Sequence, residues 1–322
     1  MNTDLSISIP TFNRAQFLDY SLSIHIPLAR KFDVAIYISD NNSSDDTFEI
    51  VQKWMKIYDY LFYSKNEVNI GPDVNFELAL KLPETKFIWL IGDTSKIKQK
   101  VFESIVEQSK EKYDLIILNE AKRVTDLKSQ LISDRNILIS NLGWHLTQIS
   151  CVVYSKELIN NTNFSSYRDT RFIHVGVVLE FLSNKDKFLA KWNQDLSTEM
   201  LRIKNVPKIS WQEDTFDIWL RKWPNFVFSL PINYSLASKK QMIRTHNNKT
   251  NIFGFKSLIF LRSEGFYSLN HLLSYKKFLK IALGRVFISE FLFVAFLPSS
   301  FVKASIKLYY SAAKLFNSQE IR

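Results

Sequence analysis

The sequence feature that most constrains the fold is the run FIWLI at residues 87–91, in which every side chain is apolar. A strand with one face in water alternates polar and apolar residues, whereas a fully apolar run of this length is typical of a strand covered on both faces in a parallel sheet. Parallel neighbours are joined by crossover helices, which cover the two faces. The run therefore predicts an α/β fold.

The first 120 residues repeat the order strand, loop and helix. Further strand patterns lie at residues 5–9, 34–39, 60–64 and 114–119, and helix patterns lie at 15–28, 46–58, 74–81 and 98–112. This alternation predicts a Rossmann-like, mostly parallel sheet with flanking helices. Beyond residue 120 the pattern is less regular, with strands expected at 148–154 and 187–192 and a helix at 171–183.

Positive charge is concentrated at the C-terminal end of the chain. The whole chain has a net charge of +10, and residues 237–322 alone hold 14 Lys and Arg against 3 Asp and Glu. This shift predicts a boundary near Ser235, between a domain of residues 1–235 and a basic, aromatic, helical extension of residues 236–322. Basic helices rich in phenylalanine are typical of segments that lie on an anionic lipid surface.

The nearly continuous apolar run at residues 286–297 bears on the partner of this extension. Nucleic acid would attract the same positive charges, but an apolar run fits acyl chains better than a phosphate backbone. The run is also shorter than the roughly 20 residues needed to span a bilayer. We therefore expect an interfacial anchor on an anionic membrane surface and no nucleic-acid partner. A buried C-terminal helix or an oligomer contact is the alternative.

The N-terminal residues and the single cysteine indicate the compartment. Residues 1–10 form a strand pattern without the basic and apolar segments of a secretory signal peptide. Cys151 cannot form an intramolecular disulfide, and it lies in an apolar run. We expect a cytoplasmic protein, peripheral at the inner face of the cell membrane, in which Cys151 is a buried thiol.

Polar loops follow or precede the predicted strands on one side of the sheet. They read TFNR at 11–14, DNNSSDD at 40–46, NEVNIGPDVN at 66–75 and GDTS at 92–95. Ligands of parallel sheets bind at the carboxyl ends of the strands, where such loops meet. Amide, hydroxyl and guanidinium groups suit a ribose and a diphosphate, and a carboxylate suits a divalent metal bound to that diphosphate. For Asp40, capping of the next helix is the alternative.

Together these loops resemble the inverting glycosyltransferases of family 2, and in particular the abequosyltransferase-like branch of bacterial surface-polysaccharide synthesis. The motifs that carry the resemblance are LSISIPTFNR at 5–14, ISDNNSSDDT at 38–47, NxxNIGPDVNF at 66–76 and FIWLIGDTS at 87–95. Two later segments, WQEDTFDIWLRKW at 211–223 and LPINYSLASK at 230–239, are also similar to that branch. The resemblance covers roughly residues 5–240 and implies the GT-A fold.

The resemblance implies transfer of a sugar from a nucleotide-diphosphate donor to a hydroxyl of a lipid-linked or surface glycan, such as O-antigen or capsule. In the family, the first loop borders the nucleotide, the Asp after the second strand contacts the base, and the acidic turn holds Mn²⁺ or Mg²⁺. The residues expected in the nucleotide-sugar site are Thr11, Asn13, Arg14, Asp40, Asn41, Asn69, Gly71, Asp73, Asn75 and Asp93.

The acidic turn departs from the family pattern. The usual turn reads like GDDD, whereas Asp93 is the only acid among residues 92–95. Water and phosphate oxygens complete the shell of Mg²⁺, so one carboxylate can suffice with weaker affinity. His246 is the candidate for an additional metal ligand, with a surface histidine as the alternative. Metal-independent transfer, or a non-catalytic sugar-nucleotide-binding or scaffold subunit, is the alternative for the chain. A nucleotidyltransferase is a further alternative, but it would show a Gly-rich, basic first loop, whereas this loop reads PTFNR.

The general base is expected at the start of a helix in the acceptor-binding half, where family 2 enzymes commonly place an Asp. The candidates are His174 and Asp169, with Glu180 further along the same helix pattern. The alternatives are a helix cap for Asp169 and a satisfied, partly buried His174.

Two other clusters are interpreted as structural. Trp211, Trp219 and Trp223, together with Phe216, have helical spacing and are expected to be core. Glu213 and Asp214 are expected in a helix N-terminal turn.

Overall fold

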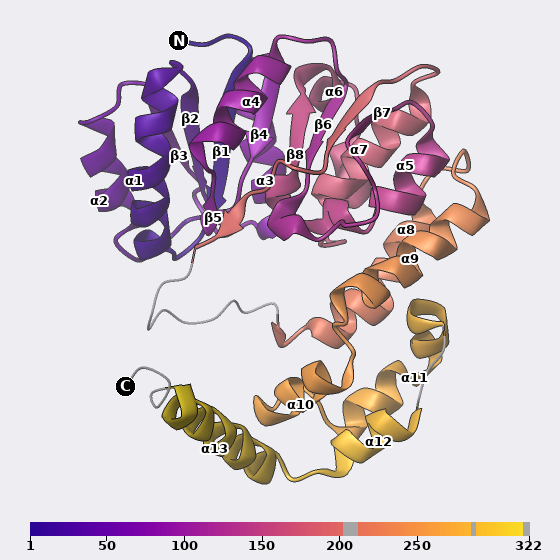
Figure 1. The fold of residues 1–322 in the computed structure, drawn as a ribbon. Helices are drawn as coiled ribbons and strands as arrows, with labels where there is room; N and C mark the ends of the chain where they lie inside the picture. The colour runs from indigo at the N-terminus through magenta and orange to yellow at the C-terminus, as the bar shows by residue number, and fades with distance from the viewer. Residues whose placement is uncertain (202–211, 285–287, 318–322) are drawn as a thin grey trace. The chain divides into compact units, whose positions relative to one another are not determined.

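The computed structural model describes residues 1–201, 212–284 and 288–317. An eight-stranded sheet with the order β3-β2-β1-β4-β8-β6-β9-β7 forms its N-terminal part (Figure 1). Six strands run in the same direction, and β8 and β7 run antiparallel to their neighbours. The strands are β1 Leu5–Thr11, β2 Ala35–Asp40, β3 Leu61–Lys65, β4 Phe87–Leu90, β6 Leu115–Leu118, β7 Gln130–Ile132, β8 Val152–Ser155 and β9 Ala190–Asn193.

Helices cover both faces of this sheet. They are α1 Ala15–Lys31, α2 Thr47–Met55, α3 Pro72–Lys81, α4 Gln99–Ser109, α5 Arg135–Leu142, α6 Lys156–Asn160 and α7 Ile173–Asn184. Strand β1 shows how the sequence assigns the faces. Leu5, Ile7 and Ile9 pack in one apolar cluster with α1 and α4. Ser8, on the opposite face, donates from Oγ to the carbonyl of Ala79 in α3 at 2.6 Å, because a small side chain lets that helix approach.

The predicted α/β class is confirmed. Every residue of β4 is fully buried, as the apolar run required. Helix α3 begins two residues earlier than predicted, because Gly71 adopts φ 81° and Pro72 occupies the first helical turn. The sequence did not predict β7 or a two-stranded ribbon of β5 (Ser95–Lys96) and β10 (Glu199–Met200), whose strands are too short to show a period.

Short helical turns connect the later strands. They are η1 Glu120–Lys122, η2 His145–Thr147, η3 Ile149–Cys151 and η4 Phe164–Tyr167. Cys151 is a buried free thiol, as predicted, although it precedes β8 instead of lying within it.

The chain divides into two compact units. One consists of Met1–Val206 and Phe228–Met242, and the other of Pro207–Val227 and Ile243–Arg322. Residues 228–242 thus return to the first unit, where Tyr234 donates to the carbonyl of Leu179 at 2.7 Å and the amide of Ser235 donates to Asn136 at 2.9 Å. The division therefore differs from a single boundary near Ser235, because these contacts with α5 and α7 were not visible in the charge pattern.

The second unit is helical, as the sequence predicted. Its elements, with the two helices that join the units, are η6 Asp217–Lys222, α8 Trp223–Ser229, α9 Leu236–Thr250, α10 Phe255–Ser263, α11 Leu269–Leu283, α12 Ile288–Phe296 and α13 Ser299–Asn317. Phe216 stacks on Tyr267 with ring centroids 4.9 Å apart, and Trp223 is 1% exposed, so the predicted aromatic core face is confirmed there. Asp214 accepts from the amide of Ile218 in the predicted helix turn. Trp211 and residues 286–287 lie outside the described residues.

Hydropathy limits what the helices of the described residues can do in a bilayer. No single one is long and apolar enough to cross a membrane, while Ile288–Phe296 and Ser299–Leu308, bent by 93°, meet the length and composition test as a pair.

Candidate functional site

The loops after β1 and β2 lie side by side at the carboxyl edge of the sheet. Thr11 and Asp40 are register partners at the ends of their strands, and the amide of Asn41 donates to the carbonyl of Thr11 at 2.9 Å. The amide of Asn66 continues this pairing onto the carbonyl of Asp40 at 2.9 Å. The polar segments that the sequence placed in three separate loops therefore form one surface.

Asp40 uses its carboxylate within its own loop. Its Oδ1 accepts from the amide of Ser43 at 2.8 Å and from the Ser43 hydroxyl at 2.6 Å, and its Oδ2 accepts from the Tyr63 hydroxyl at 2.6 Å. The side chain is fully buried. The helix-cap alternative for Asp40 is wrong, because α2 begins at Thr47 and Asp45 accepts from the Thr47 amide at 3.2 Å. The contact between Asp40 and a base stays a prediction.

Asn13 locks the first loop to the second. It adopts φ 51°, a left-handed conformation that asparagine tolerates better than most residues. Its amide donates to the Ser43 hydroxyl at 2.8 Å, and its side-chain oxygen accepts from the amide of Ser44 at 2.8 Å. Asp45 accepts from the amide of Ala15, the first residue of α1, at 2.9 Å. The two loops therefore hold each other in place.

A chain of amide side chains fixes the third loop. Asn41 donates to Asn69 at 2.8 Å and accepts from Asn66 at 3.2 Å, while Asn66 also donates to Asn75 at 3.2 Å. Asn75 lies in the first turn of α3 and donates back to the carbonyl of Ser39 at 3.1 Å. The structure thus brings these predicted binding residues together, and their side-chain amides hold the loops in place.

Asp73 connects α3 to the segment before α7. It is buried in the first turn of α3, and its Oδ2 accepts from the amide of Arg171 at 2.8 Å. Asp169 and Arg171 both have positive φ, 64° and 72°, so this segment is a strained turn. The strain and the contact with Asp73 bring the predicted acceptor-side residues next to α3.

Asp93 lies where the first loop and the acidic turn meet. Its Oδ2 accepts from the Thr11 hydroxyl at 3.1 Å, and its Oδ1 lies 3.5 Å from the Arg14 guanidinium. Burial raises the pKa of Asp93 to about 6, against the opposing effects of Arg14 and Thr11. The sequence predicted all three residues for the site, and the structure brings them into contact.

Ser150, which the sequence did not single out, supports the acidic turn. Its hydroxyl accepts from the amide of Gly92 at 3.1 Å and bonds to the hydroxyl of Ser95. His25 of α1 is fully buried and accepts from the amide of Ile97 at 3.1 Å. No local pattern could reveal these contacts, because the partners are 55 to 72 residues apart in the chain.

The donor set around Asp93 fits a cation that takes a single protein carboxylate. No group of three or more His, Cys, Asp and Glu side chains that could hold a metal occurs in the part of the chain that the structure describes. Asp93 offers one buried carboxylate, and phosphate and water oxygens would complete the shell.

His246 lies in the second unit. Its ring stacks on Trp219 with centroids 3.8 Å apart, and the residue is 3% exposed. The alternative reading as a surface histidine is wrong, because the tryptophans of η6 and α8 bury the ring. Its role as a metal ligand stays a prediction.

His174 and Asp169 differ in environment. His174 is the second residue of α7, 5% exposed, and its Nε2 lies 3.3 Å from the carbonyl of Thr147. A carbonyl only accepts, so this contact assigns the proton to Nε2 and the lone pair to Nδ1. Burial lowers the pKa of His174 to about 4, so the ring is neutral. Asp169 is exposed. It does not occupy the N-cap of α7, which is Phe172, so the cap alternative is wrong.

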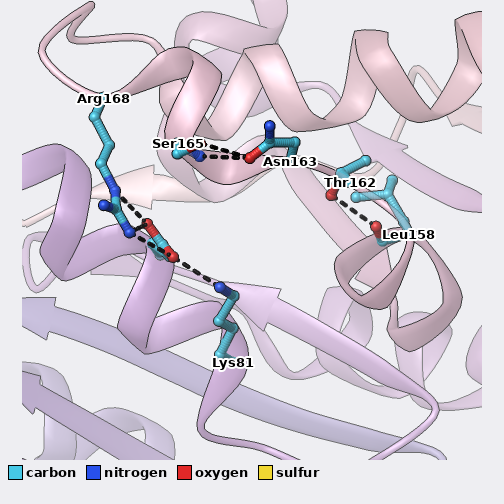
Figure 2. A network of polar contacts seen from close by, with 7 residues as sticks. Lys81, Leu158, Thr162, Asn163, Ser165 and Arg168 are labelled. Atoms are coloured by element: carbon cyan, nitrogen blue, oxygen red, sulfur yellow. Dashed lines mark hydrogen bonds and ion pairs between the residues drawn. The ribbon is translucent and has the colours of Figure 1, made fainter.

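An ion-pair network holds α3 against the segment before α7. Glu77 of α3 accepts from Lys81 at 2.7 Å and from Arg168 Nε at 2.9 Å, and Figure 2 shows Lys81 and Arg168 pointing toward this carboxylate. Glu180 accepts from the amide of Asn163 at 3.0 Å, which gives that candidate a structural role.

A cavity of about 520 Å³ lies at the opposite edge of the sheet, near the amino ends of β4, β6 and β9. Its lining includes Phe87, Asp114 and Leu189. Parallel sheets bind their ligands at the carboxyl edge, so this cavity is separate from the candidate site.

The chain is similar to known glycosyltransferases. Residues 6–131 match the family model described as Glycosyl transferase family 2. The chain is 29% identical over 199 residues to the abequosyltransferase RfbV of Salmonella typhimurium, covering 54% of this chain and 60% of that protein. It is 25% identical over 173 residues to the GalNAc(5)-diNAcBac-PP-undecaprenol beta-1,3-glucosyltransferase of Campylobacter jejuni, covering 50% and 54%. The chain thus spans little more than half the length of these relatives.

Solved structures share the fold. Residues 1–349 of S. aureus TarS, in complex with UDP-GlcNAc, give a TM-score of 0.59 at 15% identity, covering 88% of this chain and 82% of that chain. The mannosyltransferase PcManGT from Pyrobaculum calidifontis, in complex with GDP-Man and Mn²⁺, gives 0.56 at 13% identity, covering 96% and 88%. At these identities the likeness shows the fold alone, and it confirms the predicted GT-A fold.

Proposed function

Because residues 6–131 match the model described as Glycosyl transferase family 2, we propose that this chain transfers a sugar from a nucleoside-diphosphate donor to a hydroxyl of a lipid-linked or surface-glycan acceptor, with inversion. The observation that carries the proposal is the convergence of Thr11, Arg14 and Asp93 at the carboxyl edge of the sheet. Thr11 is polar and uncharged, Arg14 is cationic, and Asp93 is a buried acid. A diphosphate and its counter-ion require groups of these kinds.

Arg14 and Asp93 have different roles at the leaving group. The Arg14 guanidinium supplies positive charge to the diphosphate, which carries the negative charge that develops as the sugar leaves. Asp93 holds Arg14 in place and, with its second oxygen, holds the Thr11 hydroxyl. Asp93 would be the protein ligand of Mn²⁺ or Mg²⁺, and the cation would neutralise the leaving diphosphate as a Lewis acid.

The acceptor hydroxyl requires a base, for which Asp169 and His174 remain the proposed residues. Asp169 is exposed on a strained turn that contacts α3 through Asp73 and Arg171. His174 carries an unprotonated Nδ1 for which the described residues supply no hydrogen-bond partner. Loss of transfer in Asp169→Asn, with His174→Gln still active, assigns the base to Asp169, and the reverse result assigns it to His174.

We propose that the second unit holds the enzyme on the inner face of the cell membrane, where a lipid-linked acceptor lies. Exposed apolar side chains project from α12 and α13, including Phe293, Phe296 and Phe301 at 57%, 68% and 63% exposure. Lys303 and Lys307 lie on α13, as Phe301 does. Phenylalanines at the acyl boundary and lysines near anionic headgroups are the groups that such a surface binds.

Vesicle binding tests the membrane proposal. The full-length chain is expected to sediment with anionic vesicles and less with zwitterionic ones, and the triple change Phe293→Ser, Phe296→Ser and Phe301→Ser is expected to abolish sedimentation. Phe12→Ser, at an exposed residue of the first unit, serves as control. Unchanged sedimentation of the triple variant would contradict the membrane assignment.

Turnover of a donor panel tests the catalytic proposal. Purified protein is incubated with UDP-sugars and GDP-sugars, with Mn²⁺ or with EDTA, and release of the nucleoside diphosphate is measured. We expect metal-stimulated release from one donor and a loss of at least about 100-fold in Asp93→Ala, since a group that stabilises leaving-group charge contributes on that order. Asp59→Ala, in an exposed turn, is the matched control.

The depleted acidic turn favours one competing function, a non-catalytic subunit that binds a sugar nucleotide. Tight donor binding without turnover on any acceptor would select it. Turnover that depends on neither the metal nor Asp93 would support the transferase and contradict the metal site.

A further inference from the structure

The loop after β6 has an unusual backbone for a segment without glycine. Ala121 and Lys122 adopt φ 52° and 55°, in the left-handed region. Asn119 closes the loop around them, donating to the carbonyls of Val124 at 2.8 Å and Gln194 at 3.0 Å and accepting from the Val124 amide at 2.9 Å. Two consecutive strained residues persist only where their surroundings hold them, and such strain gathers at functional sites.

This loop presents a carboxyl and a guanidinium that are close but not bonded. Glu120 is 3% exposed, and its Oε2 has no hydrogen-bond partner among the described residues; the same holds for Nη1 of Arg123. Burial raises the pKa of Glu120 to about 7, and the nearby charge of Arg123 opposes the rise. The guanidinium also lies over the ring of Trp144, 4.6 Å from its centroid. The pair therefore leaves donors and acceptors unused.

Two more polar atoms beside the pair are unused within the described chain. His145 lies 2.9 Å from the carbonyl of Leu118 through Nε2, which assigns that nitrogen as the donor and leaves a lone pair on its partnerless Nδ1. The hydroxyl of Thr198 is fully buried and partnerless, although the carbonyl of the same residue accepts from the amide of Ala121 at 3.3 Å. Buried polar atoms in folded proteins are almost always bonded, so a gathering of four requires an explanation.

The gathering lies beside the turn that carries Asp93. Ser150 bonds to the amide of Gly92, and the next residue, Cys151, is close enough to Glu120 and Arg123 for their charges to act on its thiol. A second connection runs through the segment that ends at Leu201, whose amide donates to the carbonyl of Thr94 at 2.7 Å. A diphosphate at Asp93 would therefore carry its attached sugar into the neighbourhood of this loop.

We propose that Glu120 and Arg123, with Thr198, form a specificity-determining subsite that binds hydroxyl groups of the donor's sugar ring. The proposal rests on the function proposed above. A carboxyl group accepts from one or two ring hydroxyls, and a guanidinium donates to them in a fixed planar fork. A ring hydroxyl is both donor and acceptor, so it satisfies groups of both kinds that the protein leaves unpaired. A site built in this way rejects a sugar that lacks the matching hydroxyl.

A short strand covers the subsite. Strand β10 packs against η1 and pairs with β5 through Glu199 with Lys96 and Met200 with Ser95, and the Leu201 amide adds one further bond to Thr94. Such a brief pairing opens at small cost, and opening it gives the sugar ring access to Glu120.

The subsite is tested by measuring the binding of nucleoside diphosphates with and without an attached sugar. Isothermal titration with UDP-GlcNAc, UDP-glucose and GDP-mannose is compared with titration of UDP and GDP, for wild type, Glu120→Gln, Arg123→Leu and Thr198→Val. We expect the Kd of the sugar nucleotide that wild type binds to rise at least tenfold in the variants. The Kd of the free diphosphate should stay within twofold.

A stability measurement on the same proteins separates binding from folding. Removing an unpaired buried hydroxyl is expected to keep or raise the Tm of Thr198→Val while its sugar-nucleotide Kd rises. A merely structural role would lower Tm and leave Kd unchanged. Glu111→Gln, at an exposed residue after α4, is the control.

Two outcomes would overturn the inference, and they are distinguishable. If all three variants bind the sugar nucleotide as wild type does, the subsite is refuted and the proposed function stands. If wild type binds none of the sugar nucleotides and neither diphosphate, the proposed function itself fails together with the subsite.

Discussion

At the scale of single residues, the structure separates side chains that hold the loops from side chains that remain available to a ligand. Asp40 accepts three hydrogen bonds from Ser43 and Tyr63 and is fully buried. Asp93 interacts with the Thr11 hydroxyl at 3.1 Å, with the backbone of Thr94 and with Arg14 at 3.5 Å, and Arg14 keeps further donors. Asp40 therefore shapes the loop after β2, while Asp93 and Arg14 keep capacity for the proposed diphosphate.

Tyr63→Phe tests the loop-shaping role of Asp40. The change removes one of the three donors to a buried carboxylate, so we expect a loss of about 1 to 2 kcal/mol in the free energy of unfolding, measured by urea denaturation. Nucleotide Kd is expected to rise, because the loop loosens. Tyr20→Phe, at a residue 47% exposed, should change neither quantity. Equal effects of the two changes would contradict this account of Asp40.

At the scale of elements, α3 and α7 link the loops at the carboxyl edge of the sheet to the segment that holds the proposed base. Glu77 joins α3 to Arg168 (Figure 2). Asp73 joins α3 to Arg171, and Phe76 meets the ring of His174 edge-on, with centroids 5.7 Å apart. Both helices start where predicted within two residues. Their contacts hold the start of α7, which carries His174, and the turn at Asp169 against α3.

A double-mutant cycle measures the link between Glu77 and Arg168. Glu77 is 6% exposed and Arg168 44% exposed, so solvent screens the pair on one side only. We expect Glu77→Ala to destabilise by about 1 to 3 kcal/mol and the coupling energy with Arg168→Ala to be about 1 kcal/mol. A coupling energy near zero would show that the two bonds to Arg168 do not stabilise the fold.

Gly176 allows η4 to approach α7. A Cβ at this position would lie 2.3 Å from Cγ of Tyr167, whose ring is packed there. Gly176→Ala is therefore expected to destabilise by about 1 to 3 kcal/mol, although alanine favours helices. Ser183→Ala, in the same helix, removes a buried hydroxyl without a partner in the described residues and is expected to be neutral or stabilising. A stabilising Gly176→Ala would show that Tyr167 can move away.

At the scale of the whole molecule, buried titratable groups have opposite effects on the free energy of unfolding as the pH falls. Burial lowers the pKa of His25 and His174 to about 4 and that of His145 to about 3. The unfolded chain would take up protons on these rings near pH 6.5, so they reduce stability as the pH falls below that value. Asp93 and Glu120, with pKa values raised to about 6 and 7, act in the opposite direction.

His25→Gln isolates one of these contributions. Between pH 6.5 and 4 the unfolded wild type binds a proton on His25 that the folded state does not bind. The variant should therefore lose less stability on acidification, with a slope flatter by up to about 1.4 kcal/mol per pH unit. His271→Gln, at a ring that is only partly buried, should change the slope less. Unfolding free energies measured at half-unit pH intervals check both, and parallel curves for His25→Gln and wild type would contradict the assignment.

The sequence by itself determined the fold class and which polar loops would meet. The apolar strand at residues 87–91 and the alternation of strands with helices left a parallel sheet as the only way to bury that strand. The carboxyl ends of parallel strands share one edge, so loops far apart in the chain had to meet there. Thr11, Arg14 and Asp93 were predicted for this reason, and they are in contact.

Only the tertiary structure decided which polar side chains are already bonded and which are unused. One partner of Asp40 is Tyr63, 23 residues away, and one partner of Asp73 is the amide of Arg171, 98 residues away. His246 reads as polar surface in the sequence and is buried against tryptophans. Glu120 and Arg123 gave no sequence signal, because a carboxyl and a guanidinium three residues apart are ordinary on a surface. Burial without hydrogen bonds made them unusual, and burial depends on segments that the chain brings back from far away.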